Sequence, residues 1–261
     1  MLERFFHDIK KYAYFCGYSA RVDLRSEVAN SYLNWIWWVL EPLASMFIYY
    51  VIFMNILGRG VDNYVLFIYS SSLMWSFFNR CMLFDVQSVR LNREIVNKVY
   101  LPKFILIISN LIFNGFKILI SIGILFVMLF IFRVEFTWTM LWFIPIWLLL
   151  ILFTFGIGMI AMHFGVFVDD LSHALAIFMN ILFYLSGVFY DLKQILPSPW
   201  GFVLVKVNPI AAFMDAQRNA LLYNTPPDAP VMICWLVISL VLCAVGVKLV
   251  YRYENSYVKT I

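Results

Sequence analysis

Charged residues are scarce in this chain: Asp, Glu, Lys and Arg make up 13% of its 261 residues, whereas hydrophobic residues make up 64%. Together with a mean hydropathy of +0.86, this composition excludes a soluble globular protein. The hydrophobic runs are continuous rather than alternating, and a helix needs about 20 such residues to cross a bilayer. The sequence therefore predicts an all-α integral membrane protein.

Several familiar motifs are also absent. Neither GxxxxGK(S/T) nor GxGxxG occurs, which excludes nucleotide binding through either phosphate-binding loop. Charged residues such as Glu3, Arg4 and Asp8 interrupt the first apolar stretch, so we expect no cleavable signal peptide. The four cysteines lack CxxC spacing and predict neither a metal site nor a disulfide framework; they are Cys16, Cys81, Cys234 and Cys243.

The apolar runs predict six transmembrane helices within a domain of residues 31–261. We expect the spans at about 33–57, 64–84, 104–132, within 136–168, 171–190 and 229–247. Residues 1–30 instead place apolar side chains at spacings of three and four, opposite charged ones. That pattern predicts an N-terminal amphipathic helix in the membrane interface, although a helix packed on a partner protein fits it too.

The positions of Lys and Arg predict the orientation of the chain. With both termini in the cytoplasm, eleven bases lie inside and five outside, as the positive-inside rule requires. The inner bases are Arg4, Lys10, Lys11, Arg21, Arg25, Arg90, Arg93, Lys98, Lys103, Arg252 and Lys259, and the outer ones are Arg59, Arg133, Lys193, Lys206 and Arg218.

The outer segment between spans five and six, residues 191–224, is unusually apolar for a loop. Prolines divide it into pieces that are too short to cross a membrane. We therefore expect short re-entrant helices at the outer mouth of a pathway, and a helix that merely caps the bundle is the alternative. The outer-gate candidates in this segment are Trp200, Asn208, Pro209 and Arg218.

Ionisable residues within the apolar runs are few, and each needs a reason. Glu41 is expected at a shallow depth or in a cavity, and Lys117 is expected to extend its ammonium towards the interface. Beyond His163, the adjacent Asp169 and Asp170 are the pair that a metal and a diphosphate could use. The simpler interpretation is that they begin the fifth span as acids at a helix N-terminus.

Aromatic residues, at 19% of the chain, are the other excess. Aromatic faces offer sugars an apolar platform, and Tyr adds a hydroxyl; contact with lipid is the alternative role. The candidates for a channel lining are Tyr49, Tyr50 and Phe53 in the first span and Phe178, Phe183, Tyr184 and Tyr190 in or near the fifth.

The polar string NREIVNKVYLPK, residues 92–103, lies between the second and third spans. It places Arg93, Lys98 and Lys103 beside a single acid, Glu94. A compact polar helix between spans predicts contact with a soluble partner on the cytoplasmic side.

Three segments together carry a family resemblance. SYLNWIWWVLEP, residues 31–42, is similar to a Ser-x-Leu-Gly-x-x-Trp-x-x-Leu-x-Pro entry into the first span, and residues 92–103 to an Asn…Lys-Val-x-x-Pro element. The third segment is Asn208-Pro209 followed by Arg218. In this order they resemble the membrane permeases of type-2 ABC exporters for cell-surface polysaccharides, which include O-antigen, capsule and wall teichoic acid exporters.

The resemblance implies a role for the polar string and a set of partners. Residues of about 86–102 would form a coupling helix on a separate ATPase subunit, which would bind ATP and Mg, so this chain would not itself be an enzyme. The coupling residues would be Arg90, Asn92, Arg93, Glu94, Asn97, Lys98, Tyr100 and Pro102.

The resemblance also implies a substrate and an assembly. Two copies of the chain, in the inner membrane of a bacterium, would export an undecaprenyl-diphosphate-linked polysaccharide, with no role for nucleic acid. Arg21, Arg25 and Arg90 are the candidates for binding the lipid diphosphate. Two alternatives remain: a membrane enzyme that uses a metal on Asp169 and Asp170 to act on a polyprenyl-phosphate sugar, and a small-molecule exporter of the same superfamily.

Overall fold

The computed structural model describes residues 2–29, 32–57 and 63–260, and every regular element within them is a helix. These elements are α1 (Leu2–Ala29), the 3₁₀ helix η1 (Asn34–Ile36), α2 (Trp37–Leu57), α3 (Tyr64–Asp85), α4 (Ser88–Leu91), α5 (Arg93–Lys98), α6 (Phe104–Ile131), the 3₁₀ helix η2 (Trp138–Trp142), α7 (Phe143–Phe167), α8 (Leu171–Leu185), α9 (Leu192–Ile195), α10 (Trp200–Val207), α11 (Pro209–Leu221) and α12 (Ala229–Thr260).

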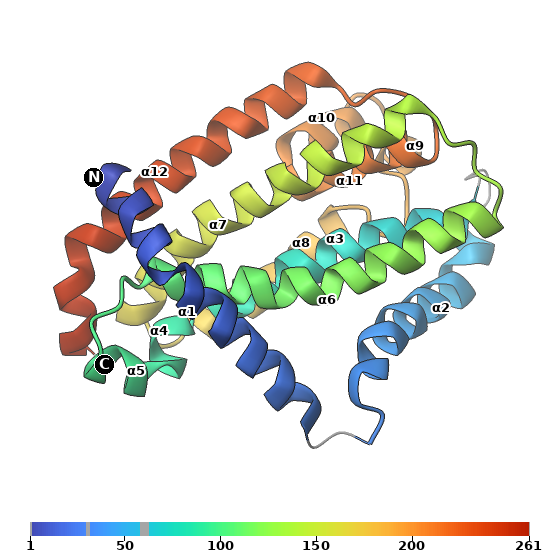
Figure 1. Ribbon diagram of the computed structural model, residues 1–261. Helices are drawn as coiled ribbons and strands as arrows, with labels where there is room; N and C mark the ends of the chain where they lie inside the picture. The colour runs from blue at the N-terminus through green and yellow to red at the C-terminus, as the bar shows by residue number, and fades with distance from the viewer. Residues whose placement is uncertain (1, 30–31, 58–62, 261) are drawn as a thin grey trace.

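The long helices α3, α6, α7 and α12 run along a common direction and form a bundle (Figure 1). Both termini lie at one end of this bundle, together with α4 and α5, and we call it the α4–α5 end (Figure 1). The short helices α9, α10 and α11 lie toward the other end. The bundle therefore separates the polar string 92–103 from the apolar segment 191–224.

Three stretches of helix are long and apolar enough to cross a membrane: Phe104–Ile131, Trp138–Phe167 and Ala229–Tyr257. Trp37–Phe53 and Leu171–Leu185 are shorter apolar helices. Within the most apolar window of each long stretch, 56% of the residues are buried in the second but only 22% and 17% in the first and third. The chain is thus an all-helical membrane protein in which α7 is central and α6 and α12 expose apolar sides.

Small residues bring α7 and α12 close together. A Cβ added to Gly156 would lie 2.9 Å from both the Cys243 backbone nitrogen and the Leu242 Cβ atom, and one on Gly246 would lie 2.8 Å from the Met159 Cβ atom. Only glycine permits backbones to approach this closely, as in other membrane helix pairs. This packing fixes α12 along α7 and carries it to the α4–α5 end.

The helix bounds agree with some of the expected helix positions and correct others. Span three was expected at 104–132, and α6 ends one residue earlier. The fifth helix ends at Leu185 rather than near residue 190, because Ser186 and the left-handed Gly187 (φ 65°) terminate it. The last helix continues from 247 to 260, because its polar end packs on α1. Pro145 lies in the first turn of α7, where a helix tolerates proline.

Candidate functional site

The segment of about 86–102, for which the sequence predicts a single helix, forms two short helices, α4 and α5. The break is at Asn92, whose backbone leaves the helical region and whose side-chain amide donates to the Ser88 carbonyl at 2.8 Å. Asn92 is thus the residue at which α4 ends, and α5 begins at the next residue, Arg93.

One face of this pair of helices is open to solvent, and the other is fixed to the bundle. Val96 and Pro102 are buried, and Arg90 and Asn92 are half-buried. We call the exposed set the coupling surface; it consists of Leu91, Arg93, Glu94, Ile95, Asn97, Lys98, Val99 and Tyr100. Apolar and charged side chains exposed together on a rigid helix pair are typical of a surface that binds another protein.

Arg90 connects α4 to the turn between α7 and α8. Its guanidinium donates to the Val166 carbonyl at 3.0 Å and forms an ion pair with Asp169. Asp169 makes this pair with a side chain that is 88% exposed, and Asp170 is exposed as well. Within the described residues, no group of three His, Cys, Asp or Glu side chains is arranged to hold a metal ion.

A hydrogen-bonded network joins the coupling surface to both ends of the chain. The Arg4 guanidinium donates to the Tyr100 hydroxyl at 2.7 Å and lies 3.5 Å from the Glu254 carboxylate. The Tyr12 hydroxyl donates to the Tyr100 carbonyl at 3.2 Å. The sequence gives no signal for this network, because its members lie up to 250 residues apart.

The same network includes the polar end of α12. The Tyr251 hydroxyl donates to the Asp8 carboxylate at 2.7 Å. Next to it, Lys103 is almost fully buried; burial lowers the pKa of its ammonium, and the charge of Glu254 opposes that shift. The segment that follows α5 is therefore tied directly to α1 and, through Arg4, to α12.

A buried polar ladder extends from the coupling segment into the bundle. Asp85, the last residue of α3, is fully buried; one of its oxygens accepts from the Asn110 amide at 2.9 Å. Asn114, one turn further along α6, donates to Asn110 at 2.7 Å. The Ser88 hydroxyl donates to the Asp85 carbonyl at 2.8 Å. The ladder ties the end of α3 and the start of α4 to α6.

A groove between α1, the start of α2 and α6 contains the two basic residues that the sequence assigns to a lipid diphosphate. Arg21 and Arg25 lie one turn apart on α1 and line a cavity of about 490 Å³. Its other walls are apolar and include Trp35, Ile112 and Phe116. We call it the α1–α6 groove. Arg90 is not part of it and is instead paired at the α4–α5 end.

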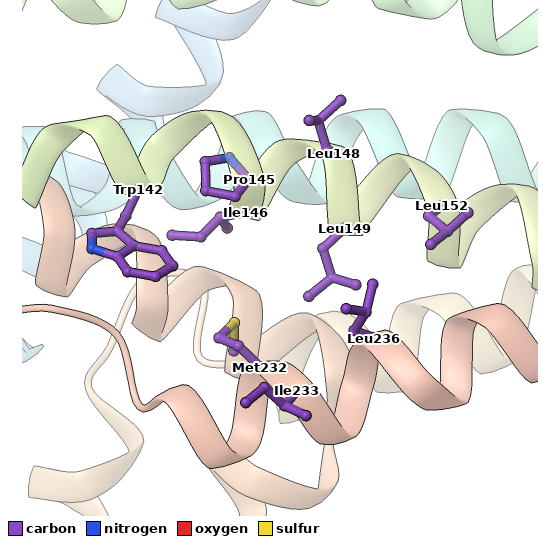
Figure 2. Close-up of a pocket in the computed structure, with 9 residues that line it drawn as sticks. All are labelled: Trp142, Pro145, Ile146, Leu148, Leu149, Leu152, Met232, Ile233 and Leu236. Carbon is purple, nitrogen blue, oxygen red and sulfur yellow. The ribbon is translucent and has the colours of Figure 1, made fainter.

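A second groove, between α7 and α12, differs in its chemistry. It has a volume of about 350 Å³, and its lining of Trp142, Pro145 and aliphatic or Met side chains includes no charged residue (Figure 2). A phosphate or a carboxylate would find no cation there. The α1–α6 groove is the one of these two that offers both an apolar wall and positive charge.

Two ion pairs lie beside the α1–α6 groove. Lys117, which was expected to extend its ammonium towards the interface, has a side chain that is only 10% exposed, and its ammonium lies 2.6 Å from the carboxylate of Glu27 on α1. Glu41 accepts from the Arg80 guanidinium at 2.6 Å. Trp38 lies between the two pairs and lines both the groove and a small adjoining cavity.

The predicted channel aromatics partly gather in one cluster between α2, α3 and the end of α8. Phe53 stacks on Phe189 at 4.3 Å between ring centroids, and Tyr49 lies 5.8 Å from the same ring. Phe183 contacts Trp75 of α3 at 5.3 Å. Tyr184 and Tyr190 also contact Phe189, at 6.0 and 5.4 Å. Tyr50 and Phe178 have no ring contact among the described residues, and Phe178 is exposed.

Of the four outer-gate candidates, Asn208 and Arg218 are buried, Pro209 is half-buried and Trp200 is exposed. Asn208 caps α11 by accepting from the Ile210 backbone N–H at 3.1 Å and donates to the Ser186 hydroxyl at 3.0 Å. Pro209 then occupies the first helical position, where its fixed φ suits the helix. Trp200 is exposed at the start of α10. The cap and the turn after α8 are thus a single hydrogen-bonded unit.

Arg218, in α11, also binds the turn that follows α8. Its guanidinium donates to the carbonyls of Gly187 at 2.7 Å and Val188 at 3.0 Å and lies 3.5 Å above the Phe67 ring. Burial lowers the pKa of Arg218 to about 10, and the charge of Asp215 opposes that shift, so the side chain stays charged at neutral pH. A buried charge at this place sets the position of α11 relative to α3 and the turn.

Comparison with known proteins places these elements in a family. The family model described as ABC-2 type transporter matches residues 19–222, which is most of the chain. The chain belongs to the ABC-2 type transporter family. The match includes the coupling surface, the aromatic cluster and Arg218, and it leaves out the start of α1 and all of α12.

Individual relatives of this ABC-2 type transporter chain are similar along most of their length. An O-antigen export system permease protein RfbA from Klebsiella pneumoniae is 25% identical over 238 residues, covering 89% of this chain and 91% of the relative. Its namesake from Myxococcus xanthus is 22% identical over 220 residues, covering 84% and 85%. The polysialic acid transport protein KpsM of Escherichia coli is 22% identical over 204 residues, covering 77% and 78%.

Proposed function

We propose that this chain is the transmembrane subunit of an ATP-driven exporter that moves an undecaprenyl-diphosphate-linked polysaccharide across the cytoplasmic membrane. The observation that carries the proposal is the coupling surface, an exposed helix pair at the end of an apolar bundle that has no phosphate-binding loop of its own. Relatives named for O-antigen export and for polysialic acid transport support the substrate class.

ATP hydrolysis, with its Mg, belongs in this proposal to a separate subunit that docks on the coupling surface. Exposed Leu91, Ile95 and Val99 supply apolar contacts, and the charged residues around them select the partner. The Arg4–Tyr100–Glu254 network transmits the partner's movement, because it joins the coupling surface to α1 and α12.

The proposed topology has six spans and both termini in the cytoplasm. The spans are α2, α3, α6, α7 with η2, α8 extended by residues 186–190, and α12. The α4–α5 end then faces inward with most of the basic residues, in agreement with the positive-inside rule. Helices α9 to α11, of 4, 8 and 13 residues, are too short to cross and form the outer re-entrant segment.

Six helices are few to enclose a polymer, so two copies of the chain would form the path together. The aromatic cluster is then the part of each copy that meets the glycan. Tyr184 and Phe178 on α8 are exposed in the single chain and are placed to line that path. Aromatic faces let sugar rings slide because they offer apolar contact with few fixed hydrogen bonds.

Arg21 and Arg25 are the residues that we assign to the lipid diphosphate. They supply positive charge in a groove whose apolar wall suits an isoprenoid chain. Arg90 is not included, because Asp169 and the Val166 carbonyl already engage its guanidinium.

Affinity purification from the native membrane tests this proposal. A tag on the chain should recover an ATP-binding subunit with two copies of each protein, and the purified complex should hydrolyse ATP. Recovery of the chain alone, without associated ATPase activity, would contradict the proposal.

A further inference from the structure

The α1–α6 groove carries more positive charge than the described residues neutralise. No carboxylate lies within ion-pair distance of Arg21 or Arg25 among the residues that the structure describes. Both side chains line a cavity whose remaining walls are mostly apolar. Both arginines are exposed, so their guanidinium groups are available to an anion from outside the chain.

A third cation, Lys117, lines the small cavity that adjoins this groove at Trp38, and it is already paired. The Lys117 ammonium lies 2.6 Å from one oxygen of Glu27, and the other oxygen accepts from the Trp38 indole N–H at 3.3 Å. Trp38 also lines the α1–α6 groove, so this carboxylate lies at the edge of the cavity that Arg21 and Arg25 line. The Lys117 side chain is 10% exposed, whereas that of Glu27 is 40% exposed.

This difference in burial decides which partner can leave. A lysine within an apolar helix needs a counter-charge, whereas a half-exposed glutamate near a helix end can turn towards water. A phosphate group offers several acceptor oxygens and about two negative charges, against one charge for a carboxylate. Exchange of Glu27 for a phosphate would therefore keep Lys117 paired and add Arg21 and Arg25 as further partners.

We propose that Lys117, with Arg21 and Arg25, forms the phosphate site of an isoprenoid-like lipid in the α1–α6 groove, and that Glu27 is a resident anion that the phosphate displaces. The assignment to a lipid rests on the apolar wall of Trp35, Ile112 and Phe116, which a free phosphate would not use. The inference rests on the proposed function, since it names residues for the lipid diphosphate and adds a competing group.

Displacement of Glu27 has a structural consequence at the coupling surface. The Glu27–Lys117 pair holds the last turn of α1 on α6, and the first turn of the same helix contacts Tyr100 through Arg4. Release of one end of a single 28-residue helix by the lipid would therefore reach the coupling surface. This gives the exporter a route by which bound lipid signals to its ATPase.

Binding of farnesyl diphosphate to the purified permease–ATPase complex in phosphatidylcholine nanodiscs tests the inference. Lys117→Met should weaken the affinity by about tenfold, because one charge-assisted contact is lost. Glu27→Gln should tighten it by about fivefold, because the competing anion is removed. In the Lys117→Met background, Glu27→Gln should have no further effect. If Glu27→Gln weakens binding as Lys117→Met does, the pair is only a structural contact and the inference is overturned.

Matched variants distinguish the site from general changes in charge or stability. Asp215→Asn removes the carboxylate of another 2.6 Å pair, with Lys193, and should leave the affinity unchanged. Lys117→Arg should retain binding, which separates loss of charge from misfolding. Inorganic pyrophosphate should bind at least tenfold more weakly than farnesyl diphosphate, and equal binding would overturn the assignment to a lipid.

Failure of this inference can be distinguished from failure of the proposed function. A wild-type complex that does not bind farnesyl diphosphate overturns this inference, even where the chain recovers an ATPase subunit and supports polysaccharide export. Absence of an ATPase subunit would instead contradict the proposed function itself.

Discussion

Substitution of Arg218 is the sharpest test of how the segment between α8 and α12 is held. Arg218→Met keeps most of the side-chain volume but removes the donors to the Gly187 and Val188 carbonyls. It also removes the cation from above the Phe67 ring. The turn after α8 and helix α11 then lose their direct connection.

The size of the effect follows from these contacts. Each buried carbonyl left without a donor costs about 1–3 kcal/mol, and a desolvated cation–π contact contributes about 2 kcal/mol. The variant no longer buries a charge, which offsets part of this loss. A net loss of about 3 kcal/mol should lower the thermal midpoint of the purified chain by about 6–12 °C. Export of polysaccharide should fall with it, because the position of α11 is no longer fixed.

Two comparisons make the prediction specific. Arg218→Lys retains the charge but cannot reach both carbonyls with a planar fork, so its midpoint should lie between those of Met and the wild type. Lys206→Met removes an exposed cation of the same outer segment, whose pair with Asp228 spans 3.6 Å, and should change the midpoint little. An Arg218→Met chain with wild-type midpoint and wild-type export would refute the reasoning.

Two further predictions concern the coupling surface and the bundle. The double variant Glu94→Arg, Lys98→Glu should retain less of the ATPase subunit during affinity purification while the chain stays folded. Unchanged retention and unchanged export would rule out this surface as the docking site. Gly158→Ala should destabilise the bundle, because the added Cβ would collide with a buried Asp85 oxygen. In Gly17→Ala the added Cβ meets no atom within 4 Å, so this variant should be as stable as the wild type or more stable, by up to about 1 kcal/mol. Thermal midpoints of both variants check this, and equal shifts would contradict it.

Hydrophobic runs predicted the long helices well where residues in the sequence mark both ends of the helix. The extent of α6 could be predicted because Pro102 and Lys103 precede an apolar run in which Lys117 is the one charged residue, and Arg133 follows it. The break at Asn92 could not, because it depends on one side-chain hydrogen bond to the Ser88 carbonyl. Local patterns report long helices better than they report the joints between short ones.

Contacts between distant residues account for what the sequence did not predict at the candidate site. Of the coupling residues that the resemblance implies, Glu94, Lys98 and Tyr100 are exposed in the structure, on the coupling surface, whereas Pro102 is buried. The partners of that surface, Arg4 and Glu254, belong to opposite ends of the chain and follow only from packing.

Charges within the apolar runs illustrate the same limit. Lys117 alone suggested a side chain that reaches the interface, because no local residue offers it a carboxylate. Its partner Glu27 lies 90 residues away on α1, and only the approach of α1 to α6 brings the two together. The sequence could state that this lysine needs an explanation, but not which residue supplies it.

Loss of surface polysaccharide in a strain that lacks this chain tests the central claim most directly. The account predicts that surface polysaccharide disappears, that lipid-linked polymer accumulates on the cytoplasmic side of the inner membrane, and that the wild-type chain restores export. Surface polysaccharide that is unchanged without the chain, with no lipid-linked polymer retained inside, would contradict the account.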